Sequence, residues 1–101
     1  MKIISVLTIM GSLLLCPSAS AAEKKLDCVK VWDDNAAIGG RAHARNECAG
    51  PAEFKFVINN DTDCPYRKAG KDVKLSCPYG SPFAGLEKVL IKYKGKEYVN
   101  R

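Results

Sequence analysis

Residues 53–64 read EFKFVINNDTDC, and this stretch decides the fold. Its apolar residues Phe54, Phe56 and Ile58 recur at every second position, which is the period of a β-strand with one face in a core. A polar turn follows the strand, and Cys64 then anchors the chain covalently. The stretch therefore predicts a core strand, a loop and a covalent anchor, beside which the other elements pack.

Residues 1–22 have the pattern of a secretory signal peptide. Lys2 precedes an apolar run of about 14 residues, and small residues lie where signal peptidase cleaves. The run is too short for a membrane span, which needs about 20 apolar residues. We therefore expect a secreted, extracellular protein in which residues 23–101 form a single domain, with a later trim after Lys25 left open.

Four cysteines lie in this domain, an even number for an exported chain: Cys28, Cys48, Cys64 and Cys77. A domain of about 79 residues buries a small fraction of its surface, so it needs covalent staples, and we expect two disulfides. Four cysteines allow three connectivities. The pairing that we favour, Cys28 with Cys64 and Cys48 with Cys77, joins the first two strands to later elements. No metal or other cofactor is expected, because the sequence has no C-x-x-C pair and His43 is its only histidine.

Alternation predicts six strands, at residues 26–32, 41–48, 53–58, 71–77, 86–93 and 96–100. Residues 33–35 supply a turn, and the proline-containing segments 64–70 and 78–85 are expected to be loops, because proline cannot donate to a sheet ladder. Lys94 and Gly95 suit a tight hairpin turn. The short link after the second strand indicates that it pairs with the third in antiparallel fashion. The fold class is therefore all-β, a small six-stranded antiparallel sandwich or barrel stapled by two disulfides.

The second predicted strand separates a polar face from a face of small residues. Ala42 and Ala44 lie on the small-residue face, which suits the close approach of another sheet or a disulfide. Val73 is expected to point inward from the fourth strand. Trp32 and Tyr93 are expected to pack in the core.

The polar face of the second strand carries side chains of the kinds that general acid–base catalysis uses, namely His43, Arg45 and Glu47. A ribonuclease-like site would need further histidine partners on neighbouring strands, and the sequence holds no second histidine. Ser76 and Ser81 lack the elbow motif of a serine hydrolase. We therefore assign no catalytic residue, interpret this face as exposed and polar, and expect a protein that is not an enzyme.

Aromatic and basic residues outside the predicted core suit a contact surface for a partner. The expected partner-binding residues are Tyr66, Arg67, Lys68, Tyr79, Phe83, Lys92, Lys94 and Lys96. The aromatic members lie in predicted loops, and the loop at 78–85 has the character of a protruding inhibitory loop. Asn60 begins the sequon N-D-T and is a candidate for glycosylation.

The formal charge of +5, or +4 without Lys2, is spread along the chain. Its densest run of lysines is interleaved with Glu87 and Glu97, which favours solvated edge strands. We therefore expect no nucleic-acid binding, and a membrane surface is a less favoured partner than a host protein. The protein is expected to be a monomer.

The opening strand Asp27-Cys28-Val29, about six short strands and four cysteines resemble the layout of small secreted effectors of plant-pathogenic fungi, of the MAX type. That family has a six-stranded β-sandwich in which a cysteine on the first strand is bridged to one before a later strand. Cys28 and Cys64 would correspond to that bridge, whereas Cys77 and the C-terminal hairpin depart from the family's spacing. The resemblance implies a non-catalytic virulence protein that binds a host protein. The alternatives are a basic antimicrobial or toxin-like protein and an extracellular enzyme inhibitor.

Overall fold

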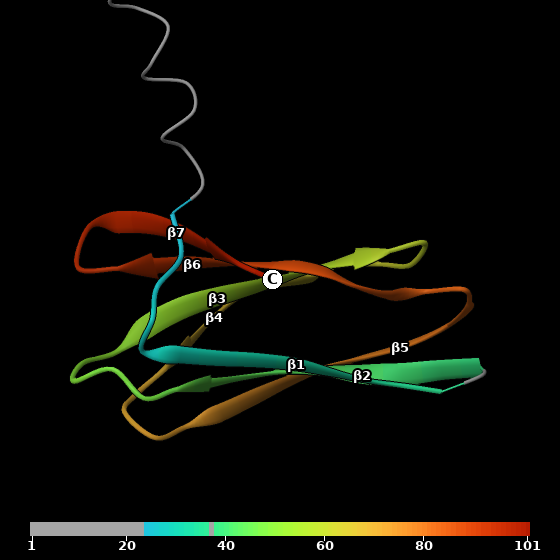
Figure 1. The fold of residues 1–101 in the computed structure, drawn as a ribbon, viewed down its shortest axis with the longest axis horizontal. Coiled ribbons are helices and arrows are strands. Elements are labelled where there is room, and N and C mark those ends of the chain that lie inside the picture. The colour runs from blue at the N-terminus through green and yellow to red at the C-terminus, as the bar shows by residue number, and fades with distance from the viewer. Residues whose placement is uncertain (1–23, 37) are drawn as a thin grey trace, which may run out of the picture.

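The computed structural model describes residues 24–36 and 38–101, so the predicted signal peptide lies outside the described residues. The described chain forms seven strands, β1 (Val29–Asn35), β2 (Ile38–Asn46), β3 (Ala52–Asn59), β4 (Cys64–Ala69), β5 (Lys74–Pro82), β6 (Gly85–Tyr93) and β7 (Lys96–Asn100). Sheet A has the strand order β1-β2-β5, and sheet B has the order β4-β3-β6-β7. Figure 1 shows the two sheets as stacked layers. Within these residues no helix is long and apolar enough to cross a membrane.

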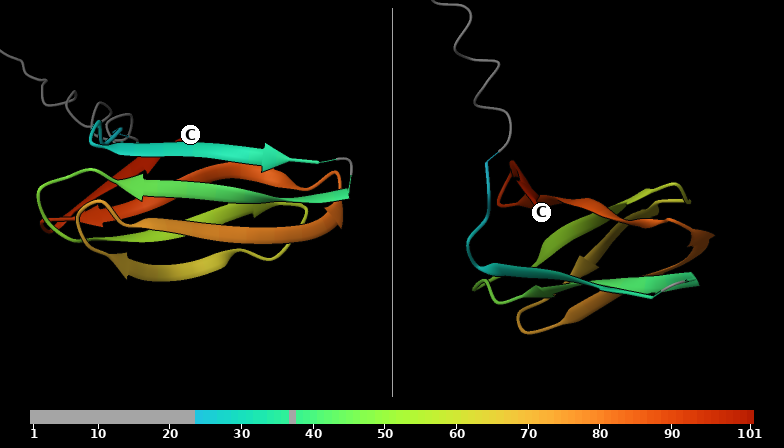
Figure 2. Two further views of the ribbon diagram at one scale, coloured as in Figure 1. Left: turned by 90° about the horizontal axis from the view of Figure 1, so that it is seen from below. Right: turned by 45° about the vertical axis from the view of Figure 1, so that its right-hand side comes forward.

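The core lies between the two layers, which Figure 2 shows from two further directions. Phe54, Phe56 and Ile58 of β3 are at most 4% exposed, so the predicted alternation of this strand is confirmed. Ala42 and Ala44 of β2 belong to the same buried cluster and are at most 1% exposed. Small side chains from sheet A therefore make room for the large side chains of sheet B, in a sandwich-like arrangement.

The count of six strands is wrong, because the segment expected to be a loop at 64–70 contains β4. The segment expected to be a loop at 78–85 is also largely strand, since β5 continues to Pro82. Both strands lie at a sheet edge, where one side of the backbone has no ladder to complete. Pro65 and Pro78 are tolerated there because a missing N–H group leaves no gap in the sheet.

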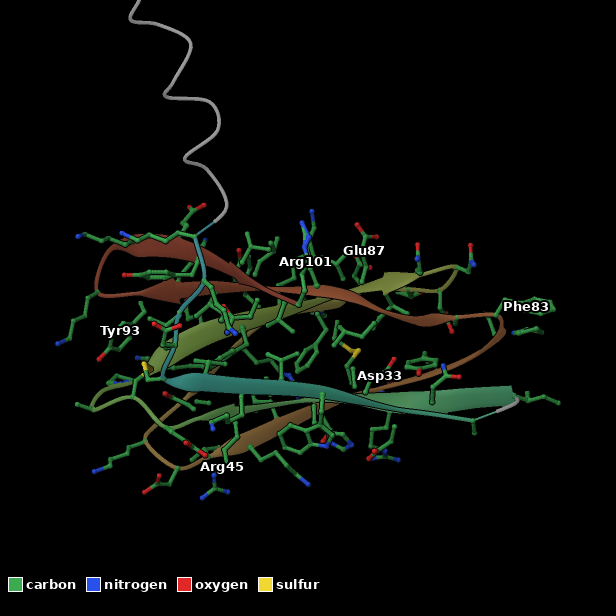
Figure 3. All side chains as sticks on the ribbon, viewed as in Figure 1. Asp33, Arg45, Phe83, Glu87, Tyr93 and Arg101 are labelled. Carbon is green, nitrogen blue, oxygen red and sulfur yellow. A yellow bond between two sulfur atoms is a disulfide. The ribbon has the colours of Figure 1, made fainter. Side chains whose placement is uncertain are left out.

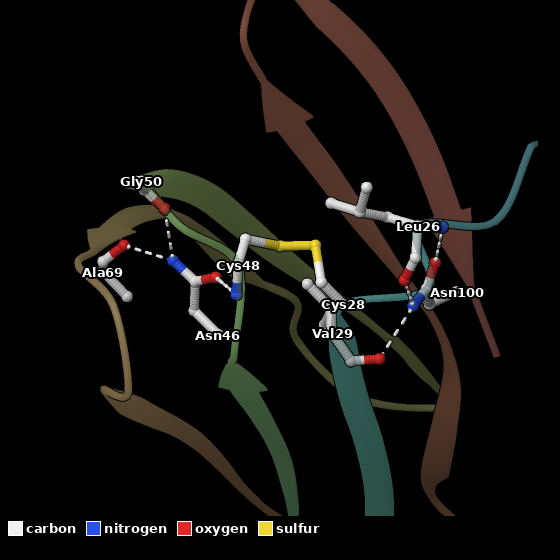
Figure 4. The surroundings of a disulfide bond; sticks show 8 residues. All are labelled: Leu26, Cys28, Val29, Asn46, Cys48, Gly50, Ala69 and Asn100. Carbon is white, nitrogen blue, oxygen red and sulfur yellow. Dashed lines mark hydrogen bonds between the residues drawn. A yellow bond between two sulfur atoms is a disulfide. The ribbon is translucent and has the colours of Figure 1, made fainter.

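The predicted pairing of the second and third strands is also wrong. β2 pairs with β1 and β5, whereas β3 pairs with β4 and β6, so the link between β2 and β3 crosses from sheet A to sheet B. Asn46 fixes this crossing (Figure 4). Its fully buried amide Nδ2 donates to the carbonyl groups of Gly50 and Ala69, both at 3.0 Å, and its Oδ1 accepts from the Cys48 N–H at 2.9 Å.

Two disulfides are present as expected, but the favoured pairing is wrong. The bonds join Cys28 to Cys48 and Cys64 to Cys77, so the bridge that the MAX resemblance implied is not formed. Because β1 and β2 are antiparallel neighbours, the residues just before β1 and just after β2 meet at the same end of the hairpin. Cys64–Cys77 instead links an edge strand of each sheet. Each bond closes a short loop and contributes about 3 kcal/mol.

Two apolar residues expected in the interior are exposed. Val73 is 43% exposed because it lies in the turn before β5, where its N–H donates to the carbonyl of Gly70. Trp32 is 38% exposed because it points away from sheet B on the outer face of β1. Tyr93, by contrast, is partly buried against the core.

Candidate functional site

The expected partner-binding residues do not form one surface. Tyr66 lies on β4 rather than in a loop and is half-buried, with the ammonium group of Lys92 at 4.3 Å from its ring centroid. Arg67 donates from its guanidinium to the carbonyl oxygen of Ser76 at 2.6 Å, beside the Cys64–Cys77 bond. Arg67 therefore helps to join the edges of the two sheets.

The expected lysines Lys68, Lys94 and Lys96 are exposed. Lys94 and Gly95 both have positive φ angles, of 51° and 75°, so the hairpin turn predicted there is confirmed. This hairpin follows Tyr93, and Figure 3 places Tyr93 and Phe83 at opposite ends of the molecule. The lysines of the hairpin and Phe83 therefore cannot contact the same small partner surface.

Phe83 is the most exposed large apolar residue that the structure describes, at 92%. It lies at the tip between β5 and β6, and its φ of 62° is in the left-handed region. Ile38, at 78% exposure, is paired in register with Pro82, the residue before Phe83. The two side chains thus extend the same end of the molecule with an apolar surface.

The loop that carries Phe83 is held by side chains from two other segments. We call residues 80–86 the Phe83 loop. Asp61, between β3 and β4, accepts from the N–H groups of Gly80 and Ser81 at 2.9 and 3.0 Å. Asn60 Nδ2 donates to the Phe83 carbonyl at 3.1 Å. The end of β1 supplies the other two contacts: Asn35 Nδ2 donates to the Ala84 carbonyl at 2.9 Å, and Asp33 Oδ2 accepts from the Leu86 N–H at 3.0 Å.

The carboxylate of Asp61 is electrostatically suited to this role. Backbone N–H groups of Thr62, Ser81 and Gly80 donate to it and lower its pKa from 3.8 to about 2. The charged form therefore persists well into acid, and the Phe83 loop keeps its contact with the β3–β4 turn over the same range.

Tyr79 is buried beside the Phe83 loop and contacts the β1 side chains that hold that loop. It lies on β5 and is 7% exposed, so its assignment to a contact loop is wrong. Its hydroxyl donates to Asp33 Oδ1 at 2.7 Å and accepts from Asn35 Nδ2 at 2.8 Å. Burial, and then the bond to Asp33, raise the pKa of this hydroxyl above 10.0. Gly40 makes room for the ring, since a Cβ there would lie 2.5 Å from the Tyr79 hydroxyl.

His43 is buried, contrary to the interpretation of its strand face as exposed. Its Nε2 lies 2.8 Å from Asp34 Oδ2 and its Nδ1 lies 2.8 Å from Ser76 Oγ, while Glu47 pairs with Arg45 at 3.5 Å instead. In a serine-hydrolase triad the serine bonds to Nε2 and the aspartate to Nδ1 of the histidine. Here Ser76 bonds to Nδ1 and Asp34 to Nε2, so the arrangement differs from that of a triad. The two bonds fix the imidazole beneath Trp32, whose indole stacks on it at 5.0 Å.

Asn60, the sequon residue, is exposed, and its φ is 62°. The side-chain nitrogen that would carry a glycan is the same Nδ2 that donates to the Phe83 carbonyl. A glycan there would stand beside the Phe83 loop.

Within residues 24–36 and 38–101 we find no pocket and no cluster of three potential metal ligands. The sequence signal for the Phe83 loop was the aromatic residue among glycines and prolines. The carboxylates and amides that hold the loop were missed, because Asp33 and Asn35 were interpreted as turn residues. Comparisons of the chain with protein-family models, with curated proteins and with solved structures find no match.

Proposed function

We propose that this chain is a secreted, non-catalytic effector-like protein that binds a host protein by inserting Phe83 into an apolar pocket of that partner. The observation that carries the proposal is an almost fully exposed phenylalanine in a strained backbone conformation, held by side chains from distant segments.

The backbone of Phe83 is itself informative. A bulky residue with φ of 62° costs on the order of 1 to 3 kcal/mol and persists only where surrounding contacts impose it. Here five hydrogen bonds from Asp33, Asn35, Asn60 and Asp61 impose it. The strain stabilises no core contact, since the ring faces solvent, so a role in binding accounts for it best.

A loop fixed in this way suits insertion into a partner. Binding that orders a flexible loop loses affinity, and a loop ordered in advance avoids that loss. A single aromatic side chain that fills a pocket can supply about 2 kcal/mol or more of binding energy. Exposed Ile38 enlarges the apolar contact. The expected partner site is therefore a concave apolar pocket, matched to one aromatic ring.

The remaining parts of the proposal rest on other features. Two disulfides in a small domain are typical of proteins that function outside the cytosol. A host target comes only from the resemblance of the sequence layout to MAX-type effectors, and the bridge and strand count that this resemblance implied are not formed. The basic antimicrobial alternative fits the outer face of sheet B less well, because carboxylates such as Glu53 and Glu97 lie between the lysines there.

An extracellular enzyme inhibitor is a second candidate, and the same rigid protruding loop favours it. The two candidates differ in the pocket that Phe83 fills, which in an inhibitor is the active site of the target enzyme. An inhibitor would block that enzyme at a one-to-one ratio, whereas an effector bound elsewhere would leave its catalysis intact.

The test is affinity capture from host-tissue extract with the oxidised protein, followed by affinity measurement on the recovered partner. Phe83→Ala removes the ring and leaves the carbonyl that Asn60 holds. Val73→Ala is the matched control, because Val73 is also an exposed apolar residue but lies in another turn. We expect Phe83→Ala to bind about 30-fold more weakly and Val73→Ala to bind like the native protein. Equal binding by native and Phe83→Ala protein would refute the proposal.

A further inference from the structure

The outer face of sheet A carries an arrangement that the Phe83 loop does not use. Side chains alternate between faces, so three cross-strand rows point away from sheet B. Figure 3 shows Arg45 on this side of the molecule. The rows are Lys30, Arg45 and Lys74; Trp32, His43 and Ser76; and Asp34, Arg41 and Pro78.

The first row places three cations directly opposite one another across β1, β2 and β5. Like charges in such positions destabilise a sheet. Glu47 lies 3.5 Å from Arg45 and offsets part of the repulsion, whereas Lys30 and Lys74 are exposed. Nothing in the core requires this row, because its side chains point to solvent. An anion bound across the row would remove the repulsion.

The second row presents an aromatic surface beside these cations. The Trp32 indole stacks on His43 with an interplanar angle of 20°, and His43 is held by its bonds to Asp34 and Ser76. Because β1 is an edge strand, no strand of the described residues lies beyond the indole face that points away from β2. Trp32 is therefore a fixed ring with one face available for stacking.

We infer that this outer face binds single-stranded nucleic acid, with a base stacked on Trp32 and phosphates on the flanking cations. Adjacent rows are about 7 Å apart, a distance that one nucleotide spans between base and phosphate. On the other side of Trp32, Arg41 of β2 supplies one cation, opposite Asp34 of β1, whose carboxylate is bonded to His43 Nε2 at 2.8 Å. A polymer that alternates anions with planar rings fits this order, and in a duplex the base faces are covered.

This assignment departs from the expectation that the charge has no nucleic-acid role. The cations of the row are far apart in the sequence, at positions 30, 45 and 74, and only the strand register brings them together. The inference is independent of the Phe83 loop and of the partner proposed for it.

Trp32 is the only tryptophan of the chain, so its fluorescence reports on this face alone. We would titrate the oxidised protein at low salt with a single-stranded oligothymidine dodecamer, and follow a dye-labelled copy by anisotropy. We expect saturable quenching, and affinity that falls with salt with a logarithmic slope of about −2 to −3 for four cations. Trp32→Leu, measured by anisotropy, should bind about fivefold more weakly or worse.

Two double variants remove equal charge from different places. Lys30→Gln with Lys74→Gln should lower affinity about tenfold, whereas Lys94→Gln with Lys96→Gln, on the β6–β7 hairpin, should leave it unchanged. The first variant should also melt no lower than the native protein, because it relieves repulsion. Equal loss in both variants, or no quenching by the dodecamer, would overturn the inference. Tighter binding of poly-glutamate or heparin than of the dodecamer would also overturn it, and would assign the face to acidic proteins or acidic glycans.

Discussion

Replacement of Asn100 by alanine tests how the start of the described chain is held to its last strand. Asn100 is 1% exposed, and its Oδ1 accepts from the Leu26 N–H at 2.8 Å. Its Nδ2 donates to the Leu26 carbonyl at 3.0 Å and to the Val29 carbonyl at 3.3 Å (Figure 4). Beside this contact, the Val99 N–H donates to the carbonyl of Lys24 at 2.8 Å. One amide therefore closes a contact between residues 74 positions apart.

The magnitude follows from the groups that Asn100→Ala leaves unpaired. The amide and carbonyl of Leu26 lose their partner in a buried position, at about 1 to 3 kcal/mol for each group. A total loss of about 3 kcal/mol is a large share of the 5 to 15 kcal/mol typical of a domain. In a domain of this size it lowers the melting temperature by about 12 to 24 °C.

The assay is thermal unfolding of the oxidised protein, with Asn59→Ala as the matched control. Asn59 is exposed at the end of β3, so its truncation should change the free energy of unfolding by less than about 0.5 kcal/mol. Hydrogen exchange should accelerate at the amides of Leu26 and Val99 in Asn100→Ala. A melting temperature within about 3 °C of the Asn59→Ala value would refute the reasoning.

Two further predictions concern pH. Asp61 has a folded-state pKa of about 2 against 3.8, so its stabilising contribution is present above pH 3.8 and is lost as the pH falls through 2. Asp61→Asn should therefore melt below the native protein at pH 6, with the difference vanishing near pH 2, and a constant difference would contradict this. The pKa of Tyr79 is raised above 10.0, so its contribution is complete below pH 10 and is lost as the pH rises through the folded-state value. Tyr79→Phe should be less stable at neutral pH by about 1 to 2 kcal/mol and should lose less stability in alkali, as unfolding at successive pH values would measure.

The parts of the fold that sequence analysis predicted are those that periodicity encodes. Phe54, Phe56 and Ile58 alternate because one face of β3 meets the core, and this relation is local in the sequence. Which sheet a strand joins, by contrast, depends on residues far from that strand in the sequence. The short link after β2 is compatible with a hairpin and also with a crossing between sheets, and the choice depends on Asn46, whose partner Ala69 lies on β4. Composition assigns Asn46 no such role.

The structural roles of the prolines and the pairing of the cysteines were also not predictable from the sequence. Proline excludes a segment from the middle of a sheet, but Pro65 and Pro78 lie in edge strands, and edge position is a property of the assembled sheets. The disulfide pairing depends on the same information. Cys28 meets Cys48 because β1 and β2 pair with each other, which the sequence analysis did not foresee.

The two proposed surfaces share a physical feature, although Phe83 was expected to be a contact residue and the cation row was not foreseen. Each contains a local arrangement that opposes stability, the left-handed backbone of Phe83 in one and the row of Lys30, Arg45 and Lys74 in the other. Rules that relate sequence to structure describe stable choices, so they predict neither the left-handed backbone of Phe83 nor three cations opposite one another. In both places the surrounding structure compensates, through hydrogen bonds to the Phe83 loop and through Glu47 beside Arg45. Both proposals therefore rest on compensation at a solvent-facing position, from which the core gains nothing.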